Sequence, residues 1–259
     1  MVFIHRFLPA GLILLLLAGS PVEAGKEDGR GQGRWRRAFA SAIKDADTWA
    51  PAAAAAAIAV GGYDKKISDW ATRTTPLFGS RETAVKASDD LRLASDIGMA
   101  ASSFFLTRQS GGPRSIQGRT AYTGVGYVGA IFSTSMTDVL KAATGRLRPD
   151  GSNTGSLPSG HTSRAFAYAA FSQRTLRESG LPKGVRMGLR WSLTGLAAGT
   201  AWARVEAGAH YPTDVLVGAG LGNFAGKFVS ELILGPESEM HFSFNLNPEQ
   251  PQVLVGWSF

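Results

Sequence analysis

Residues 122–143 read YTGVGYVGAIFSTSMTDVLKAA, and this stretch decides the fold class. It is long enough for about six turns of helix, and its charged residues, Asp138 and Lys141, both lie near its end. Glycines at positions 124, 126 and 129 leave room for a neighbouring helix to approach closely. The stretch therefore predicts a buried helix.

Helical patterns continue on both sides of this stretch. Residues 35–49 are amphipathic, and the alanine-rich residues 52–60 follow Pro51, which opens or kinks a helix. Further helices are expected at residues 64–70, 82–106, 159–178, 185–205 and 212–234, with loops at 111–118 and 148–158. We predict an all-α helical bundle over residues 35–235.

The last twenty residues change character. Apolar and polar side chains alternate over residues 242–246 and again over 253–259, with a turn expected between them at 247–251. This pattern predicts a C-terminal β-hairpin extension over residues 236–259. We favour a hairpin packed on the bundle over a membrane barrel, because a barrel needs at least about eight strands.

The N-terminus has the pattern of a secretory signal peptide over residues 1–24. Arg6 precedes an apolar stretch at residues 7–19, and small or apolar residues follow at 22–24. The apolar stretch is short for a bilayer span of about 20 residues, which favours cleavage over an uncleaved anchor. We therefore expect an extracytoplasmic, periplasmic protein, with a glycine-rich, flexible segment at residues 25–34.

The amino-acid composition limits the possible classes of fold and function. Hydrophobic residues make up 44% of the chain, which suffices for a core, and the net charge of +7 suits an anionic partner. The absence of cysteine excludes disulfides and thiolate chemistry. The longest uncharged helical stretch, residues 120–137, is diluted by Gly, Ser and Thr, so we favour a soluble bundle over a membrane-embedded one. Peripheral membrane contact stays open.

Three clusters carry the candidate chemistry. Residues 141–149 read KAATGRLRP, and the seven-residue spacing of Lys141 and Arg148 places two cations on one helix face, which suits a phosphate. Taken alone, such cations at a helix end are usually solvated or favourable to the helix dipole. The first cluster is therefore informative only together with the other two.

The second cluster, PSGH at residues 158–161, lies where a loop enters a helix. Ser159 suits the N-cap, and Gly160 lets an oxyanion approach the free backbone N–H groups. His161 in that first turn can give a proton to a leaving group. The alternative is a capped helix with an exposed histidine.

The third cluster, RVEAGAHYPTD, covers residues 204–214. Pro212 suits a first helical turn, so Asp214 can reach back to His210 and fix its tautomer, which leaves the other ring nitrogen as a nucleophile. Arg204 lies just upstream. The alternative is a structural His–Asp contact. Together the clusters hold three cations, two histidines and a carboxylate, which fits covalent phosphoryl transfer.

In order and spacing, these clusters resemble the signature of the type 2 phosphatidic acid phosphatase superfamily, which includes bacterial acid phosphatases, lipid phosphatases and vanadium haloperoxidases. The resemblance implies a phosphohydrolase that cleaves monoesters or lipid phosphates and pyrophosphates through a phosphohistidine. We expect this phosphohydrolase to need no metal or other cofactor and to have no nucleic-acid partner. One position departs from the pattern, since Ala203 stands where the family usually has Ser.

The resemblance also implies a role for each residue. The phosphate oxygens would be held by Lys141, Arg148, Ser159, Gly160 and Arg204. His210 would attack phosphorus, Asp214 would orient it, and His161 would protonate the leaving oxygen. Two alternatives remain, a vanadate-dependent haloperoxidase and a non-catalytic envelope protein that uses the hairpin for binding. Activity on a generic phosphomonoester, with and without vanadate plus peroxide, separates these three functions.

Overall fold

The computed structural model describes residues 30–107, 115–235, 239–245 and 252–258. The predicted signal peptide at residues 1–24, and residues 25–29, lie outside this range. The helices are α2 (Arg30–Lys44), α3 (Ala46–Val60), α4 (Asp64–Thr74), α5 (Arg81–Leu106), α6 (Ile116–Thr144), α7 (Gly160–Glu178), α8 (Lys183–Glu206) and α9 (Pro212–Leu234). The strands are β1 (Glu239–Asn245) and β2 (Gln252–Ser258).

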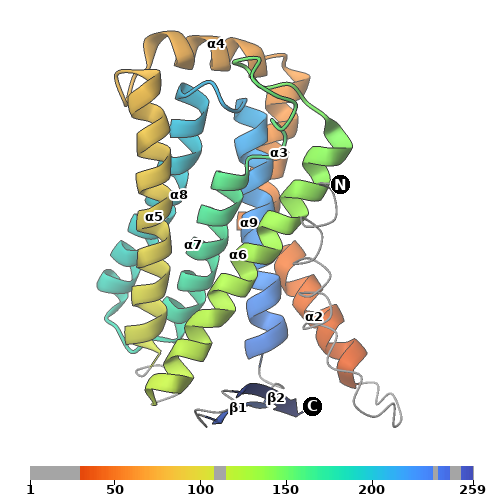
Figure 1. Cartoon of the computed structure of the whole chain (residues 1–259), viewed down its shortest axis with the longest axis vertical. Coiled ribbons are helices and arrows are strands. Elements are labelled where there is room, and N and C mark those ends of the chain that lie inside the picture. Colours follow the sequence, from red (N-terminus) through yellow and green to blue (C-terminus); the bar gives the residue numbers. More distant parts are fainter. Residues whose placement is uncertain (1–29, 108–114, 236–238, 246–251, 259) are drawn as a thin grey trace.

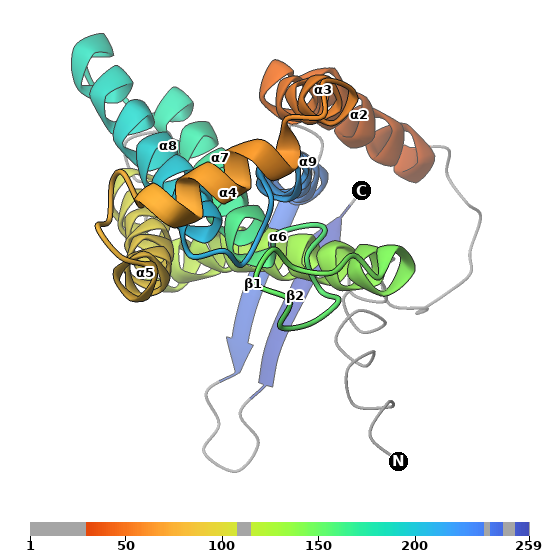
Figure 2. The same ribbon diagram turned by 90° about the horizontal axis from the view of Figure 1, so that it is seen from above.

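The helices form a bundle whose ends differ (Figure 1). α4 lies across one end, and the two strands lie at the other. Seen from above α4, the helices α7 and α9 run through the middle of the bundle (Figure 2). The prediction of an all-α bundle with a small β-hairpin is therefore confirmed. The strands pair antiparallel, with Phe242 opposite Val255, while the predicted turn at 247–251 lies outside the described residues.

The centre of the bundle depends on close contact between α7 and α9. A Cβ at Gly222 would lie 2.2 Å from the carbonyl oxygen of Ser163, and one at Gly226 would lie 2.6 Å from that of Ala167. Only glycine permits this approach, because real Cβ atoms do not come so near a backbone oxygen. α9 thus packs directly against the backbone of α7 and fixes its position.

Three helix starts differ clearly from the predicted ones. The amphipathic pattern at residues 35–49 belongs to two helices, because the Asp45 side chain accepts a hydrogen bond from the Asp47 N–H and starts α3 before Pro51. α2 also begins at Arg30, inside the segment predicted to be flexible. α6 begins at Ile116, within the predicted loop, because Ser115 caps it through the Gly118 N–H.

Candidate active site

The three clusters meet at the end of the bundle that carries α4. The loop after α6 is joined to the α8–α9 turn by a hydrogen bond from the Asp150 N–H to the Gly208 carbonyl, at 3.1 Å. The start of α7 is joined to α9 by one from the Ser159 N–H to the Asp214 carbonyl, at 3.0 Å. Segments far apart in the sequence therefore converge on one site.

His210 is 1% exposed at the centre of this site. Its Nδ1 lies 2.6 Å from the carbonyl oxygen of Ser156, which can only accept, so Nδ1 carries the proton and Nε2 keeps its lone pair. Burial, and then the charge of Arg204, lower the pKa of His210 well below its usual range. The ring is thus held neutral with Nε2 available as a nucleophile.

The hydrogen bond expected between Asp214 and His210 is not formed. Asp214 Oδ2 lies 3.9 Å from His210 Nδ1, beyond hydrogen-bonding distance. The same oxygen accepts from the Ser156 hydroxyl at 2.5 Å and from the Tyr211 N–H at 2.8 Å. Asp214 therefore positions the segment that carries the Ser156 carbonyl, and acts on His210 indirectly.

Arg146 belongs to the site, although it was not among the predicted site residues. Its guanidinium donates to Asp214 Oδ1 at 2.6 Å and to Asp64 at 2.5 Å, and it lies 4.1 Å from the centre of the Tyr211 ring. Asp64, the first residue of α4, also accepts from the Thr213 N–H at 2.9 Å. This network joins α4 to the site and supplies the charge partner of the buried Asp214.

Lys141, Arg148 and Arg204 lie close enough to influence one another. Burial lowers the pKa of Lys141, and Arg148 and Arg204 lower it further, against a raising effect of Asp138. Burial and then Arg148 likewise lower the pKa of Arg204. In the described part of the chain none of the three is in an ion pair with a carboxylate.

The start of α7 lies beside these cations. A Cβ at Gly160 would lie 3.5 Å from Lys141 Nζ. Ser159 occupies the N-cap position as predicted, but its side chain makes no capping hydrogen bond and instead accepts from the Thr162 hydroxyl at 3.0 Å. A helix N-terminus next to an ammonium group is favourable to an anion.

His161 has a partner that the sequence did not reveal. Its Nε2 lies 2.9 Å from Asp89 Oδ1 on α5. Burial and the charge of Arg204 lower the pKa of His161 to about 4, although Asp89 acts in the opposite direction. In contrast to the buried His210, the His161 side chain is 36% exposed.

The structure thus brings all the predicted site residues to one end of the bundle and adds Asp64, Asp89, Arg146 and Ser156. Arg146 could have been found from its place inside the first cluster. Asp89 and Asp64 have no local pattern that marks them, because their roles come from tertiary contacts alone. Among the described residues, no group of three or more His, Cys, Asp or Glu side chains could hold a metal ion.

The segment that holds these residues is similar to known proteins. Residues 123–234, which include every predicted site residue, match the sequence model of the PAP2 superfamily. Over 111 residues the chain is 35% identical to a lipid A 1-phosphatase from Porphyromonas gingivalis. That alignment covers 41% of this chain and 23% of the relative, so the chain spans about a quarter of the relative's length.

A solved structure extends the likeness beyond that segment. The fold resembles a transmembrane PAP2-type phosphatidylglycerolphosphate phosphatase from Bacillus subtilis, with a TM-score of 0.52 and 22% identity. The match covers 76% of this chain and 94% of that one. The family resemblance inferred from the three clusters is therefore confirmed, and the helical architecture is common to both proteins.

Proposed function

We propose that this chain, whose residues 123–234 belong to the PAP2 superfamily, hydrolyses lipid phosphates through a covalent phosphohistidine without a metal ion. The observation that carries the proposal is the convergence of Lys141, Arg148 and Arg204 beside a neutral His210. Like charges repel one another, and among the described residues none of the three cations forms an ion pair with a carboxylate, so the cluster favours an anionic ligand. The Nε–H groups of Arg148 and Arg204 are buried without an acceptor among the described residues.

The proposed reaction has two steps. In the first, His210 Nε2 attacks phosphorus, a P–N bond forms, and the P–O bond to the leaving group breaks. His161 gives its proton to the departing oxygen. In the second, water attacks phosphorus and returns a proton to His161, the P–N bond breaks, and inorganic phosphate leaves. The three cations stabilise the charge on the phosphoryl oxygens in both steps, as metal ions do in other phosphotransferases.

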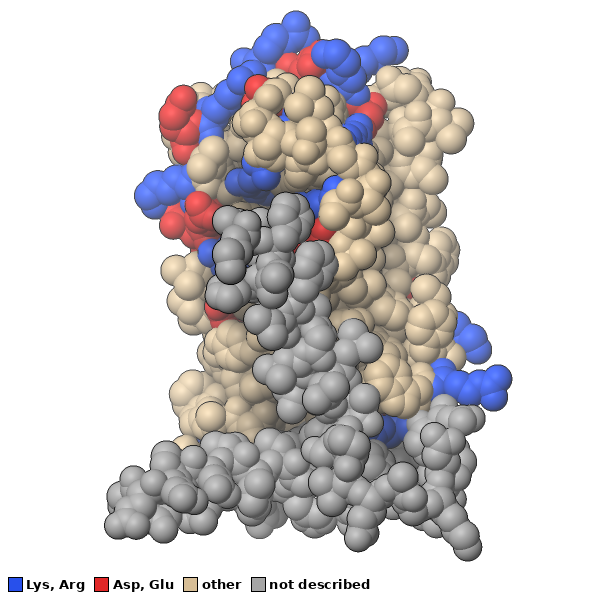
Figure 3. Space-filling view, turned by 45° about the vertical axis from the view of Figure 1, so that its right-hand side comes forward, with Lys and Arg blue, Asp and Glu red and all other residues tan. Residues whose placement is uncertain are grey.

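A lipid phosphate is the substrate class that the surroundings of the site favour. The relatives named above act on lipid A and on phosphatidylglycerolphosphate. On the face shown in Figure 3, charged side chains gather at the end that carries α4, and the surface below them is largely uncharged apart from a group of Lys and Arg side chains near the other end. Large apolar side chains are exposed on the surface of the helical bundle, among them Phe105 at 66% and Trp191 at 65%. Exposed apolar surface of this kind suits contact with lipid.

For location, we propose an exported protein that associates with a membrane. The proposal rests on the N-terminal pattern at residues 1–24 and on the exposed apolar side chains. No described helix combines the length and the hydropathy of a membrane span. N-terminal sequencing of envelope fractions, before and after carbonate extraction, tests both parts. A full-length chain recovered from the cytoplasm contradicts export, and complete release by carbonate contradicts stable membrane association.

Trapping the intermediate tests the mechanism. The protein is mixed with ³²P-labelled substrate, quenched rapidly in alkali, and analysed for an acid-labile adduct. We expect label on His210 in the wild-type protein and in His161→Ala, and none in His210→Ala. Label on another residue, or no covalent label in an active protein, overturns the proposal. Oxidation of halide by peroxide in the presence of vanadate, without phosphatase activity, would point to a haloperoxidase instead.

A further inference from the structure

A row of three side chains on α6 leads to the candidate active site. Ser133, Thr137 and Lys141 are spaced by four residues, so they lie one above the other on one face of the helix. Lys141 is in the last turn of α6, and its ammonium nitrogen lies 3.5 Å from where a Cβ at Gly160 would be, at the start of α7. The place of this cation in the site therefore depends on how α6 is positioned along α7.

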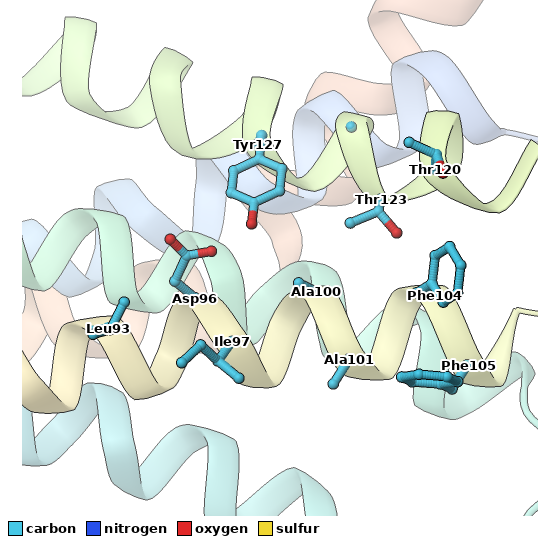
Figure 4. Close-up of a pocket in the computed structure, with 11 residues that line it drawn as sticks. Leu93, Asp96, Ile97, Ala100, Ala101, Phe104, Phe105, Thr120, Thr123 and Tyr127 are labelled. Carbon is cyan, nitrogen blue, oxygen red and sulfur yellow. The ribbon is translucent and has the colours of Figure 1, made fainter. Parts of the chain in front are cut away.

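α5 contributes little to that positioning, because it leaves space beside α6. A groove of about 630 Å³ lies between the two helices. Its walls include Asp96, Ala100 and Phe104 on α5, and Thr123 and Tyr127 on α6 (Figure 4). Two elements fix each other's position most strongly where their side chains interdigitate without voids. The position of α6 is therefore set mainly by its other neighbours, α7 and α9.

Three buried hydroxyl groups join α6 to α7. Ser133 and Thr137 on α6 and Ser163 on α7 are all 0% exposed. The Thr137 hydroxyl donates to the Ser163 hydroxyl oxygen at 3.1 Å, and the Ser133 and Ser163 hydroxyls are also hydrogen-bonded. One side chain of α7 is thus bonded to two successive turns of α6. Because hydrogen bonds weaken steeply when their geometry changes, this pair of bonds resists sliding of one helix along the other.

The Ser163 main chain is held as well. Its N–H donates to the Ser159 carbonyl at 3.0 Å, and α9 packs closely against its carbonyl oxygen at Gly222. The Thr137 methyl group lies 3.6 Å from where a Cβ at Gly160 would be, so it packs directly beneath the first turn of α7. The hydroxyl cluster therefore lies immediately below the helix start that faces the cations.

Lys141 needs such support, because the charges of Arg148 and Arg204 act against a third cation at this place. We propose that Ser163 is a positioning residue, whose two hydrogen bonds to α6 hold the Lys141 ammonium group where it contacts a bound phosphate. This inference rests on the proposed function, which requires Lys141 at the phosphate. It assigns a role in anion binding to a residue that does not itself touch the anion.

The first measurement is the dissociation constant of inorganic phosphate, determined by calorimetry at low ionic strength. Loss of an outer-shell partner of a metal ligand typically costs about 10–100-fold in affinity, and we expect about tenfold for Ser163→Ala. Ser172→Ala is the matched control, because Ser172 is equally buried on α7 and donates to the Tyr168 carbonyl within the same helix. The control should leave the affinity nearly unchanged. Equal losses in both variants, or no loss in Ser163→Ala, overturn the inference.

A double variant shows whether Ser163 acts through Lys141. Lys141→Met removes the ammonium group and should weaken phosphate binding by about 10–100-fold, as is typical of a hydrogen bond to a charged group. If Ser163 positions this group, adding Ser163→Ala to Lys141→Met should cause no further loss, because the two effects are not additive. A further loss of about tenfold in the double variant means that the two residues act independently, and it overturns the inference.

A second double variant separates positioning from stability. Ser163→Ala leaves the Ser133 hydroxyl buried without its partner, which destabilises the fold, whereas Ser133→Ala combined with Ser163→Ala removes both groups. We expect this double variant to regain stability in chemical denaturation and to keep the weakened phosphate affinity. Recovery of both properties together shows that the hydroxyls only stabilise the bundle. Thr137→Val keeps the side-chain shape and removes one of the two bonds, so it gives a smaller loss of affinity even if Ser163→Ala does not fold.

Calorimetry requires no turnover, so the two proposals can fail separately. A protein that shows the expected affinities but hydrolyses no phosphate ester contradicts the proposed function and leaves the positioning role of Ser163 in place. A protein that hydrolyses phosphate esters but binds phosphate equally well in the wild-type form and in Ser163→Ala contradicts the positioning role alone. A wild-type protein that binds no phosphate contradicts both.

Discussion

The Nδ1 atom of His210 donates to the carbonyl oxygen of Ser156 at 2.6 Å, so a main-chain group sets the tautomer of the proposed nucleophile. Asp214 supports this arrangement from outside, through the Ser156 hydroxyl and the Tyr211 N–H. The Ser156 carbonyl belongs to the main chain, so it remains when a side chain is substituted. The carboxylate should therefore matter less for this histidine than in a triad where it contacts the ring directly.

This relationship predicts a moderate effect of Asp214→Asn. Loss of a directly bonded carboxylate costs about 10⁴-fold in kcat in serine proteases, whereas loss of an outer-shell partner typically costs about 10–100-fold. We expect the smaller loss here, and less than about tenfold for Ser156→Ala, which keeps the carbonyl. Steady-state kinetics on nitrophenyl phosphate measure both. A loss of about 10⁴-fold in a folded Asp214→Asn protein would show that the carboxylate acts on the ring itself.

The pH dependence should reveal His161 as the proton donor. Its pKa is about 4, and a general acid must be protonated to act, so its active fraction falls about tenfold per pH unit above that value. An alkyl leaving group needs this proton, while a nitrophenolate leaves with little help. We expect the ratio of kcat/KM for alkyl phosphate to that for nitrophenyl phosphate to fall from pH 4 to pH 7. Taking this ratio removes much of the pH dependence that comes from ionisation of the substrates themselves.

Asp89 provides the control for this profile. Its carboxylate raises the pKa of His161, so Asp89→Asn should lower that pKa and move the falling limb to lower pH. His161→Ala should abolish the limb and reduce activity on alkyl phosphates by about 10²–10⁴-fold. A limb that keeps its position in Asp89→Asn would assign the titration to another group.

Three cations meet at the site, and no described residues there form an acidic cluster that could hold a metal ion, so we predict resistance to chelation. EDTA should leave phosphatase activity unchanged, because positive charge from side chains replaces that of a metal ion. Vanadate should inhibit, since it adopts the trigonal bipyramidal geometry of the phosphoryl transition state. Activity assays after dialysis against EDTA measure the first effect. Complete loss, reversed by Mg²⁺ or Zn²⁺, would contradict a metal-free site.

Arg146 should contribute more to stability than to chemistry. Asp214 is fully buried and Arg146 pairs with it at 2.6 Å, so Arg146→Met leaves a buried carboxylate without its charge partner. Removing one member of a buried pair typically costs about 3–5 kcal/mol. We expect a loss of about 3 kcal/mol in chemical denaturation. A double variant with Asp214→Asn should recover part of it, and an equal loss in the double variant would mean that the pair is not coupled.

The sequence predicted those site residues that can be recognised from their near neighbours along the chain. Most of the predicted site residues belong to three short clusters. Within each cluster, the spacing along a helix or turn fixes the relative positions of its members, which are Lys141 and Arg148, His161, and Arg204 and His210. The hairpin also followed from simple alternation. These features depend on neighbours within a few residues, which a single sequence displays directly.

Other features depend on contacts between distant elements. Asp89 lies in the first half of α5 and gains its role only because α7 packs beside it. The distance between Asp214 and His210 depends on where the loop after α6 places Ser156, which no helical spacing predicts. The start of α6 was missed because glycine and proline nearby indicated a loop, although Ser115 caps the helix.

The packing of α9 against α7 predicts opposite effects for two glycine substitutions. At Gly222 a Cβ would lie 2.2 Å from the Ser163 carbonyl oxygen, so Gly222→Ala should cost about 1–3 kcal/mol through overpacking. At Gly188 on α8 a Cβ meets nothing within 4 Å, so Gly188→Ala should gain about 0.5–1 kcal/mol through lower backbone entropy in the unfolded chain. Thermal and denaturant unfolding compare the two.

Phosphatase activity tests whether the contact between α7 and α9 also positions the candidate active site. Gly218, one turn before Gly222, would place a Cβ 2.7 Å from the carbonyl oxygen of Ser159, so α9 also fixes the start of α7. Forcing the helices apart at Gly222 should therefore displace Ser159 and His161 from the cations. We expect Gly222→Ala to lose activity at temperatures where it is still folded, while Gly188→Ala keeps it. Full activity in a folded Gly222→Ala protein would show that the α7–α9 contact stabilises the bundle without positioning the site.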